Sequence, residues 1–412
     1  MRPAAGGCIH AHHAYNRGDN MGLRKHIVTA VAVSGILISG MSVAAEPLKI
    51  GLSAPLSGGQ AVVGQDQVDG FNLALEQAKG QLGGRPVTVL REDDQLKPEI
   101  GAQIMRKFVE KDKVDAIVGM GFSNVFMAGL KTVVDAGVVA IATNAGPSPA
   151  AGAGCAPNVF SVAWQNDGSA EAVGQYVRSK GYKRVVLMAP NYQAGKDMVN
   201  GFKRFYQDAP ADELYTQVGQ TDYSAEIAQI QAAKADAVFV FYPGGMGVNF
   251  VKQFSQAGLL GKLPMFSVFT VDGTTMPALR EAAVGSVYGA MWDAALQTPE
   301  NRQFVDAFQA RYKRVPSEYA ATGYDAARLL DVAVKKLAGN TTDRKAFAAA
   351  VKAAGSEFRS VRGPFSFNRN NMPLQNYYMF QVVREAGQVV VKEGGVALSR
   401  HADSYAALCK RI

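Results

Sequence analysis

Residues 49–59 read KIGLSAPLSGG, and this segment predicts the first structural unit of the chain. Its apolar first half is typical of a buried strand, whereas the Ser-Gly-Gly end is typical of a tight turn. An amphipathic run over residues 67–78 then predicts a helix. Because free backbone N–H groups converge where a strand ends and a helix begins, this edge suits an anionic or polar ligand. The segment therefore predicts a small-molecule pocket.

A secretory signal precedes this segment. Basic residues at 21–26, an uncharged apolar run over 27–43 and small residues up to Ala45 are the features of a cleaved signal peptide. We therefore expect residues 1–45 to be a signal region, with Met21 as the initiator and cleavage after Ala45. The mature chain would then be a soluble periplasmic protein. The alternative is an N-terminal anchor that is retained.

Composition argues for a binding protein rather than an enzyme. The 412 residues carry a net charge of +8 without a basic cluster, so no nucleic-acid partner is expected. After signal cleavage His401 is the remaining histidine, which disfavours a Ser-His-Asp triad or a His/Cys metal site. Phosphate-binding glycine motifs are absent from the sequence. We expect no cofactor and no metal, and we expect the acidic run Glu92-Asp93-Asp94 to be solvated or to pack between the lobes, with a metal site as the alternative.

Apolar strand candidates alternate with helical patterns along the mature chain, which predicts βαβ units and mainly parallel sheets. The rhythm restarts after Trp164, so two similar α/β lobes are expected to face one another across a cleft. The strand candidates are Leu48–Ser53, Val87–Arg91, Ala116–Val118, Val138–Ala142, Arg184–Ala189, Ala237–Tyr242, Met265–Phe269 and Ser286–Trp292. The helix candidates are Gly101–Lys111, Val125–Ala136, Ser169–Lys180, Gly195–Phe205, Met246–Ala257 and Asn301–Lys313.

Ordered blocks of residues carry a family resemblance. They are Leu56-Ser57-Gly58-Gly59-x-Ala61-x-x-Gly64, Glu92-Asp93-Asp94-Gln95, Val118-Gly119-Met120-Gly121-Phe122-Ser123, Ala140-Ile141-Ala142-Thr143-Asn144-Ala145, Asn191-Tyr192-Gln193-Ala194-Gly195-Lys196-Asp197 and Gly363-Pro364-Phe365-Ser366-Phe367. In this order they resemble the type I periplasmic binding proteins, in the leucine/isoleucine/valine-binding branch that supplies ABC importers. The resemblance extends over nearly all of residues 47–412.

The resemblance implies a fold and a partner. It implies an α/β protein of two Rossmann-like lobes, with mainly parallel sheets joined by a multi-strand hinge. One lobe is expected to contain residues 46–164 and 293–372, and the other 165–292 and 373–412. Hinge closure would trap the ligand, and the closed form, expected to be a monomer, would dock on the permease subunits of an ABC importer.

The resemblance also implies a carboxylate site in the first lobe. There the hydroxyl of Ser123, after the turn that contains Phe122, and the loop Asn144-Ala145-Gly146 would hold the ligand carboxylate. Hydroxyl and amide donors at helix starts can neutralise a carboxylate without Arg or Lys. The alternative for Ser123 is that it caps the helix beginning near Val125, and both roles can coexist.

Two departures from the family pattern bear on the ligand. Gly146 stands where amino-acid binders have a small hydroxyl residue. Thr270 stands where they have the glutamate that holds the ligand ammonium, and Asp272 lies two residues further on. A buried ammonium without a carboxylate is poorly compensated, so an acid lacking the amine is expected.

The second lobe offers aromatic and amide side chains at predicted strand ends, namely Tyr192, Gln193, Tyr242 and Phe269. This set resembles the family's branch that binds aromatic acids, whose rings such side chains could enclose. The alternative for each aromatic residue is ordinary packing. The alternative functions are the binding of a branched-chain or other amino acid or amide, or a periplasmic ligand-sensing subunit.

Cysteine usage predicts one covalent link. Cys8 precedes the expected cleavage site, which leaves Cys155 and Cys409 in the mature chain. In an oxidising compartment we expect these two to form a disulfide, with two free buried thiols as the alternative.

Overall fold

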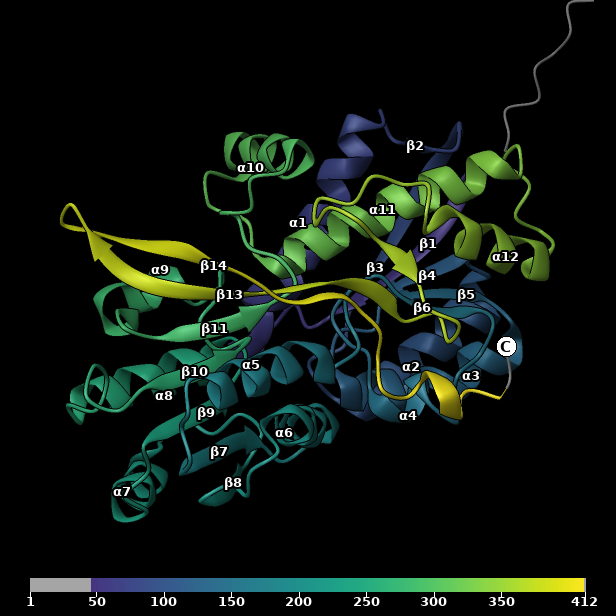
Figure 1. Cartoon of the computed structure of the whole chain (residues 1–412). Coiled ribbons are helices and arrows are strands. Elements are labelled where there is room, and N and C mark those ends of the chain that lie inside the picture. Colours follow the sequence, from purple (N-terminus) through teal and green to yellow (C-terminus); the bar gives the residue numbers. More distant parts are fainter. Residues whose placement is uncertain (1–45, 411–412) are drawn as a thin grey trace, which may run out of the picture. The chain divides into compact units, whose positions relative to one another are not determined.

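Strand β1 (Leu48–Ala54) is the centre of a sheet whose strand order is β2-β3-β1-β4-β5-β6 (Figure 1). The computed structural model describes residues 46–410, so the expected signal region lies outside the described residues. Apart from the antiparallel β2–β3 pair, neighbouring strands of this sheet run parallel. The remaining strands are β2 (Gln81–Leu82), β3 (Arg85–Asp93), β4 (Ala116–Gly119), β5 (Val139–Ala142) and β6 (Val159–Ser161).

Helices cover both faces of this sheet, which explains why its central strands are continuously apolar. Every residue of β4 and β5 is buried. Helix α1 packs on α11, and α2 packs on α3. The helices are α1 (Ala61–Gln77), α2 (Pro98–Arg106), α3 (Ser123–Ala136), α4 (Ser148–Ala151), α10 (Pro299–Tyr312), α11 (Glu318–Lys336) and α12 (Arg344–Ala354), with short helical turns at Gly58–Gln60 and Lys107–Asp112.

A glycine permits the close approach of α1 to the end of β1. A Cβ atom at Gly64 would lie 1.9 Å from the carbonyl oxygen of Pro55. A side chain here would push the helix away from the strand end. The glycine five residues after Gly59 in the first sequence block is therefore a packing requirement.

A second sheet has the order β12-β13-β11-β10-β9-β7-β8, and β14 pairs with β13. Strands β7 to β11 pair in parallel, whereas β13 runs antiparallel to β11, β12 and β14. The strands are β7 (Val185–Pro190), β8 (Asp212–Thr216), β9 (Ala237–Phe241), β10 (Met265–Val268), β11 (Val287–Ala290), β12 (Ser366–Phe367), β13 (Pro373–Glu385) and β14 (Gln388–His401). The helices are α5 (Asp167–Ser179), α6 (Gln193–Tyr206), α7 (Ser224–Ala232), α8 (Gly245–Gln256) and α9 (Met276–Leu279), with turns at Arg280–Ala283 and Ala406–Leu408.

We call the part built on the β1–β6 sheet the first lobe and the part built on the β7–β11 sheet the second lobe. The chain passes between them after β6, after β11 and between β12 and β13. The prediction of two α/β lobes with mainly parallel sheets is thus confirmed, and every predicted strand overlaps an observed one. The exact residue boundaries of the lobes stay a prediction.

The C-terminal segment crosses from one lobe to the other. Cys409 is joined to Cys155 by a disulfide. On the way, Asn370 Nδ2 donates to Asp403 Oδ1 (2.9 Å), and the Tyr405 hydroxyl donates to Asp167 Oδ2 (2.8 Å). The segment therefore contacts the first lobe through Cys155 and the start of α5 through Tyr405.

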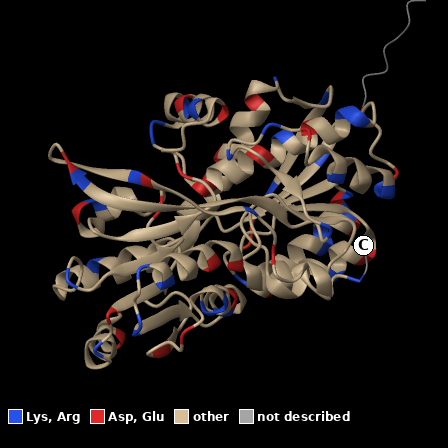
Figure 2. Ribbon diagram, viewed as in Figure 1, with Lys and Arg blue, Asp and Glu red and all other residues tan. Residues whose placement is uncertain are grey.

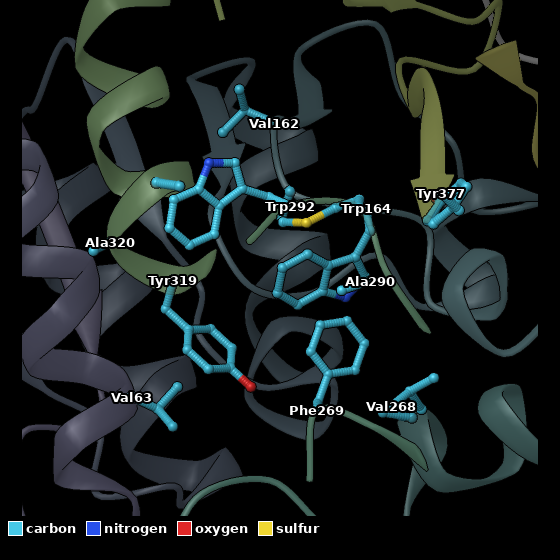
Figure 3. Packing of buried hydrophobic residues seen from close by; sticks show 14 of the residues in the cluster. Val63, Val162, Trp164, Val268, Phe269, Ala290, Trp292, Tyr319, Ala320 and Tyr377 are labelled. Atoms are coloured by element: carbon cyan, nitrogen blue, oxygen red, sulfur yellow. The ribbon is translucent and has the colours of Figure 1, made fainter. Parts of the chain in front are cut away.

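Large aromatic side chains fill the space where the two lobes meet. Figure 3 shows Trp164, Phe269 and Tyr319 pointing toward one another, with Trp292 beside them. The Trp164 and Phe269 ring centroids are 4.4 Å apart. Trp292 is buried and its indole N–H donates to Asn301 Oδ1 (2.6 Å).

Basic residues (Lys, Arg) and acidic residues (Asp, Glu) are interspersed along the ribbon of the described residues (Figure 2). Among those residues, the helices are too short or too polar to cross a membrane.

Candidate functional site

A small cavity lies where strand ends and helix starts of the two lobes meet. Clefts between domains are typical sites for small-molecule ligands. The lining residues are Gly121, Phe122, Ser123, Asn144, Ala145, Trp164, Asn166, Tyr192, Ala194, Met198, Phe241, Pro243, Phe269 and Tyr319.

The polar wall of the cavity is the start of α3. Phe122 is the N-cap residue, and the helix has no side-chain cap there. The first intrahelical bond runs from Phe126 N to Phe122 O (2.7 Å), so the N–H groups of the preceding turn lack intrahelical partners. Ser123 Oγ accepts a hydrogen bond from Asn166 Nδ2 (3.0 Å). The alternative that Ser123 caps this helix is not supported, because Ser123 is its first residue.

The loop after β5 supplies further polar groups. Asn144 and Ala145 line the cavity as expected. Gly146 is not among the lining residues, because its N–H donates to Asn166 Oδ1 (3.0 Å). A Cβ atom at Gly146 would lie 1.9 Å from the Trp164 carbonyl oxygen. The glycine thus permits a close backbone approach, and the absence of a side-chain donor for the ligand at this position stays a prediction.

Aromatic rings form another part of the cavity wall. Tyr192 lies beside Phe241 with centroids 6.2 Å apart and an interplanar angle of 17°, and beside Phe122 at 6.4 Å. Phe269 follows β10 with a φ of 51°, a left-handed conformation that is rare for a non-glycine residue and is concentrated at functional sites. Its ring contacts Trp164 within the cavity wall.

Besides Gly146, three residues predicted to bind the ligand do not line this cavity. Thr270 is fully buried; its Oγ1 accepts from Tyr242 N (2.7 Å) and donates to Val268 O (3.0 Å). The Tyr242 ring packs against Tyr223 and Phe250 on the other side of the strand end. Gln193 Nε2 donates to Asp197 Oδ1 (2.8 Å).

Side-chain alternation explains the error at Tyr242. Successive side chains of a strand point to opposite faces, so Phe241 and Pro243 share the cavity side and Tyr242 does not. Counting alternate residues along β9 would have placed Phe241, and not Tyr242, on the cavity side of the strand. Residues missed by the sequence analysis include Trp164, Asn166, Met198, Phe241, Pro243 and Tyr319, several of which lie in the segments that cross between lobes.

The cavity wall is uncharged. Among the described residues that line it, none is Asp, Glu, Lys, Arg or His. Burial, together with the nearby charge of Asp197, raises the pKa of Tyr192 well above its ordinary value, and burial does the same for Tyr319. Both hydroxyls therefore stay protonated and can donate a hydrogen bond.

The acidic run after β3 has internal partners. Asp93 Oδ1 accepts from Leu56 N (2.8 Å), and Asp94 Oδ2 accepts from Ser53 Oγ (3.3 Å). Glu92 forms an ion pair with Lys107 (2.7 Å). Within residues 46–410, Asp, Glu, His and Cys side chains form no cluster suited to a metal ion.

Fold and cavity together define a two-lobed binding protein, and sequence comparison identifies its family. Residues 47–388 match the family model described as periplasmic binding protein, so the chain belongs to that family. The family and the structures below are solute-binding proteins, which confirms that the chain belongs with binding proteins and not with enzymes.

Individual relatives agree with this assignment. A solute-binding protein of an ABC transporter from R. palustris, solved in complex with benzoate, is 32% identical, with a TM-score of 0.83 over 88% of this chain and 99% of that chain. A solute-binding protein from Rhodopseudomonas palustris BisB5, in complex with 3,4-dihydroxybenzoic acid, is 26% identical, with a TM-score of 0.80 over 87% and 99%. Leu/Ile/Val-binding protein homolog 6 of Brucella melitensis is 26% identical over 88% of this chain and 94% of its own length.

Proposed function

We propose that this chain is the extracytoplasmic solute-binding component of an ABC importer and that it captures an aromatic carboxylic acid. The observation that carries the proposal is the composition of the cavity wall. The wall combines hydrogen-bond donors of Ser123 and the α3 start with aromatic rings that include Trp164, Tyr192 and Phe269.

The donor part of the wall fits a carboxylate. Free N–H groups at a helix start and a hydroxyl donor stabilise a negative charge without a cationic side chain. The aromatic part fits a ring, because offset and edge contacts between rings add to the free energy of burial. Benzoate combines a carboxylate and a ring in one small molecule.

The uncharged wall distinguishes this ligand from an amino acid. An α-amino acid would place an ammonium group in a cavity whose described lining residues include no carboxylate. A buried ammonium without a charge partner is costly. The two solved relatives whose ligands are benzoic acids also favour the aromatic acid.

The transport role would operate by hinge closure. Because the cavity takes residues from both lobes, a ligand contacts its whole binding surface when the lobes close, and binding then shifts the population toward the closed form. We propose that the closed form is a periplasmic monomer that docks on the permease. N-terminal sequencing of periplasmic protein should find Glu46 at the start, and a chain retained in the membrane would contradict the export step.

Calorimetry tests the ligand. Protein beginning at Glu46 is titrated with benzoate, 4-hydroxybenzoate, phenylalanine and leucine. We expect the two benzoates to bind and the two amino acids to bind at least 100-fold more weakly. Tight leucine binding without binding of either benzoate would overturn the proposal.

A further inference from the structure

Asp197 lies on α6 of the second lobe, and it is 1% exposed. Its carboxylate accepts hydrogen bonds from the Ser148 backbone N–H (3.0 Å) and the Ser148 hydroxyl (2.6 Å). It also accepts from Gln193 Nε2 (2.8 Å) and Asn166 Nδ2 (2.8 Å). Because Ser148 begins α4 of the first lobe, the bonds between Ser148 and Asp197 join the two lobes.

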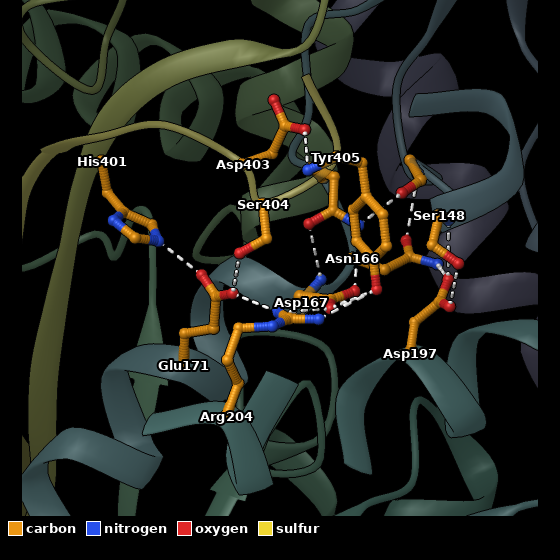
Figure 4. A network of polar contacts seen from close by, with 12 residues as sticks. Ser148, Asn166, Asp167, Glu171, Asp197, Arg204, His401, Asp403, Ser404 and Tyr405 are labelled. Atoms are coloured by element: carbon orange, nitrogen blue, oxygen red, sulfur yellow. Dashed lines mark hydrogen bonds and ion pairs between the residues drawn. The ribbon is translucent and has the colours of Figure 1, made fainter. Parts of the chain in front are cut away.

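Asn166 connects this carboxylate to the cavity. Its Nδ2 donates both to Asp197 Oδ2 and to Ser123 Oγ, and its Oδ1 accepts from Gly146 N. The orientation of the amide is fixed, because oxygen alone can accept from the Gly146 N–H and nitrogen alone can donate to the carboxylate. Figure 4 shows Ser148, Asn166 and Asp197 in one network. We call Ser123, Ser148, Asn166, Gln193 and Asp197 the Asp197 cluster.

The position of Asn166 decides what Ser123 offers to the cavity. Because Ser123 Oγ accepts from Asn166, its own proton is free to be donated elsewhere. Ser123 lines the cavity, so that proton is available to an acceptor on a ligand. Consecutive hydrogen bonds thus run from Ser123 at the cavity through Asn166, in the segment after β6, to Asp197. Asp197 in turn accepts from Ser148 of the first lobe.

We propose that the Asp197 cluster stabilises the closed form of the protein and positions the Ser123 hydroxyl for an acceptor on the ligand, a carboxylate if the proposed function holds. Asp197 and Asn166 are positioning residues. When the lobes separate, Asp197 loses both bonds from Ser148, and water replaces them. Hydrogen bonds to a charged acceptor are stronger than neutral ones, so their loss disfavours the open form.

The contact across the lobes can be measured without any ligand. Spin labels are attached to cysteines introduced at two exposed sites, Lys131 on α3 and Gln231 on α7, in the oxidised protein. Pulsed electron paramagnetic resonance then gives the distribution of distances between the lobes. We expect the free wild-type protein to populate the closed separation and Asp197→Asn to lose at least half of that population.

The control is Asp208→Asn, which removes a partly exposed carboxylate that pairs with Lys183 within the second lobe (2.8 Å). It should leave the distribution unchanged. A circular dichroism melt verifies that each variant folds, and Ser148→Ala provides a milder second variant with the same expected direction. A free wild type without the closed separation, or folded Asp197→Asn and Ser148→Ala variants with the wild-type distribution, would overturn the proposal.

Benzoate is the probe for the second half of the proposal. Asp197→Asn should weaken benzoate binding at least tenfold in calorimetry, whereas Asp208→Asn should bind like the wild type. An Asp197→Asn variant with wild-type affinity would contradict the positioning of Ser123. A wild type that does not bind benzoate would count against the proposed ligand, and the distance distributions would still decide the role of the cluster in closure.

Discussion

Arg362 and Asp325 form an ion pair in which both side chains are almost completely withdrawn from solvent, with Nη2 3.1 Å from Oδ2. Arg362 Nη1 also donates to the Ala163 carbonyl oxygen and to Gln375 Oε1, each at 2.7 Å. Ala163 lies in the segment that passes between the lobes after β6, and Gln375 lies near the start of β13. Arg362 therefore connects this segment and β13 to α11, which carries Asp325.

Removing one partner of this pair should be strongly destabilising. Asp325→Ala leaves a buried guanidinium without its counter-charge, and such changes cost about 3–5 kcal/mol of unfolding free energy. Urea denaturation followed by circular dichroism measures the loss. The control is Lys131→Ala, which breaks an exposed pair with Asp135 and should cost about 0.5 kcal/mol or less. Equal effects of the two variants would contradict the role of Arg362.

The Cys155–Cys409 disulfide closes a loop with a sequence separation of 254. On the chain-entropy estimate, a loop of this length stabilises the folded state by about 5 kcal/mol. Dithiothreitol should therefore lower the melting temperature of protein that begins at Glu46. A Cys155→Ala/Cys409→Ala double variant should melt at the reduced value with or without reductant. Two reactive thiols in denatured, unreduced protein would refute the bond.

Stability should fall as the pH rises from about 4 to 6, partly through Asp94. Burial raises the pKa of this carboxyl to about 6, against the opposing effect of hydrogen bonds from Leu96 N and Ser53. The folded state therefore binds the Asp94 proton more tightly than the unfolded state does. The resulting stabilisation of the folded state is complete below about pH 4 and is lost as the pH rises to about 6.

The variant Asp94→Asn tests this assignment. An asparagine does not titrate, and its amide can keep the contacts with Leu96 and Ser53. It should raise the unfolding free energy at pH 8 by about 2 kcal/mol and flatten the profile between pH 4 and 6. Exposed Asp222→Asn is the control for a general change in charge. An Asp94→Asn profile parallel to that of the wild type would contradict the raised pKa.

The sequence predicted the sheets well because buried parallel strands have a local signature. Strands β4, β5 and β9 are short apolar runs, and each is buried along its whole length. The long antiparallel hairpin of β13 and β14 escaped prediction, because its residues alternate irregularly and its register shifts between Gln375 and Phe380. Helix α11 escaped as well.

The candidate site was predicted in part. Ser123, Asn144 and Tyr192 line the cavity, since they follow strand ends that the pattern located correctly. Trp164 reaches the cavity from the segment that passes between the lobes after β6, and Tyr319 reaches it from α11. Their positions depend on how distant segments pack, which a single sequence does not reveal.

Thr270 should act on stability and not on ligand binding. Thr270→Val removes the acceptor for the buried Tyr242 N–H, and an unpaired buried donor costs about 1–3 kcal/mol. Benzoate affinity should stay within about twofold of the wild type. Thr342→Val, at an exposed position, is the control for the substitution. A large loss of affinity at unchanged stability would return Thr270 to the binding site.

Ser123 should act on ligand binding. Ser123→Ala removes a hydroxyl donor from the polar wall of the cavity and leaves the α3 backbone in place, because Ala is a good helix former. The loss of one hydrogen bond to a carboxylate should weaken benzoate binding by about 1–2 kcal/mol, roughly 5- to 30-fold. Calorimetry on Ser123→Ala and on the exposed control Ser179→Ala measures the difference. If folded Ser123→Ala binds benzoate as tightly as Ser179→Ala, the carboxylate does not lie at the start of α3.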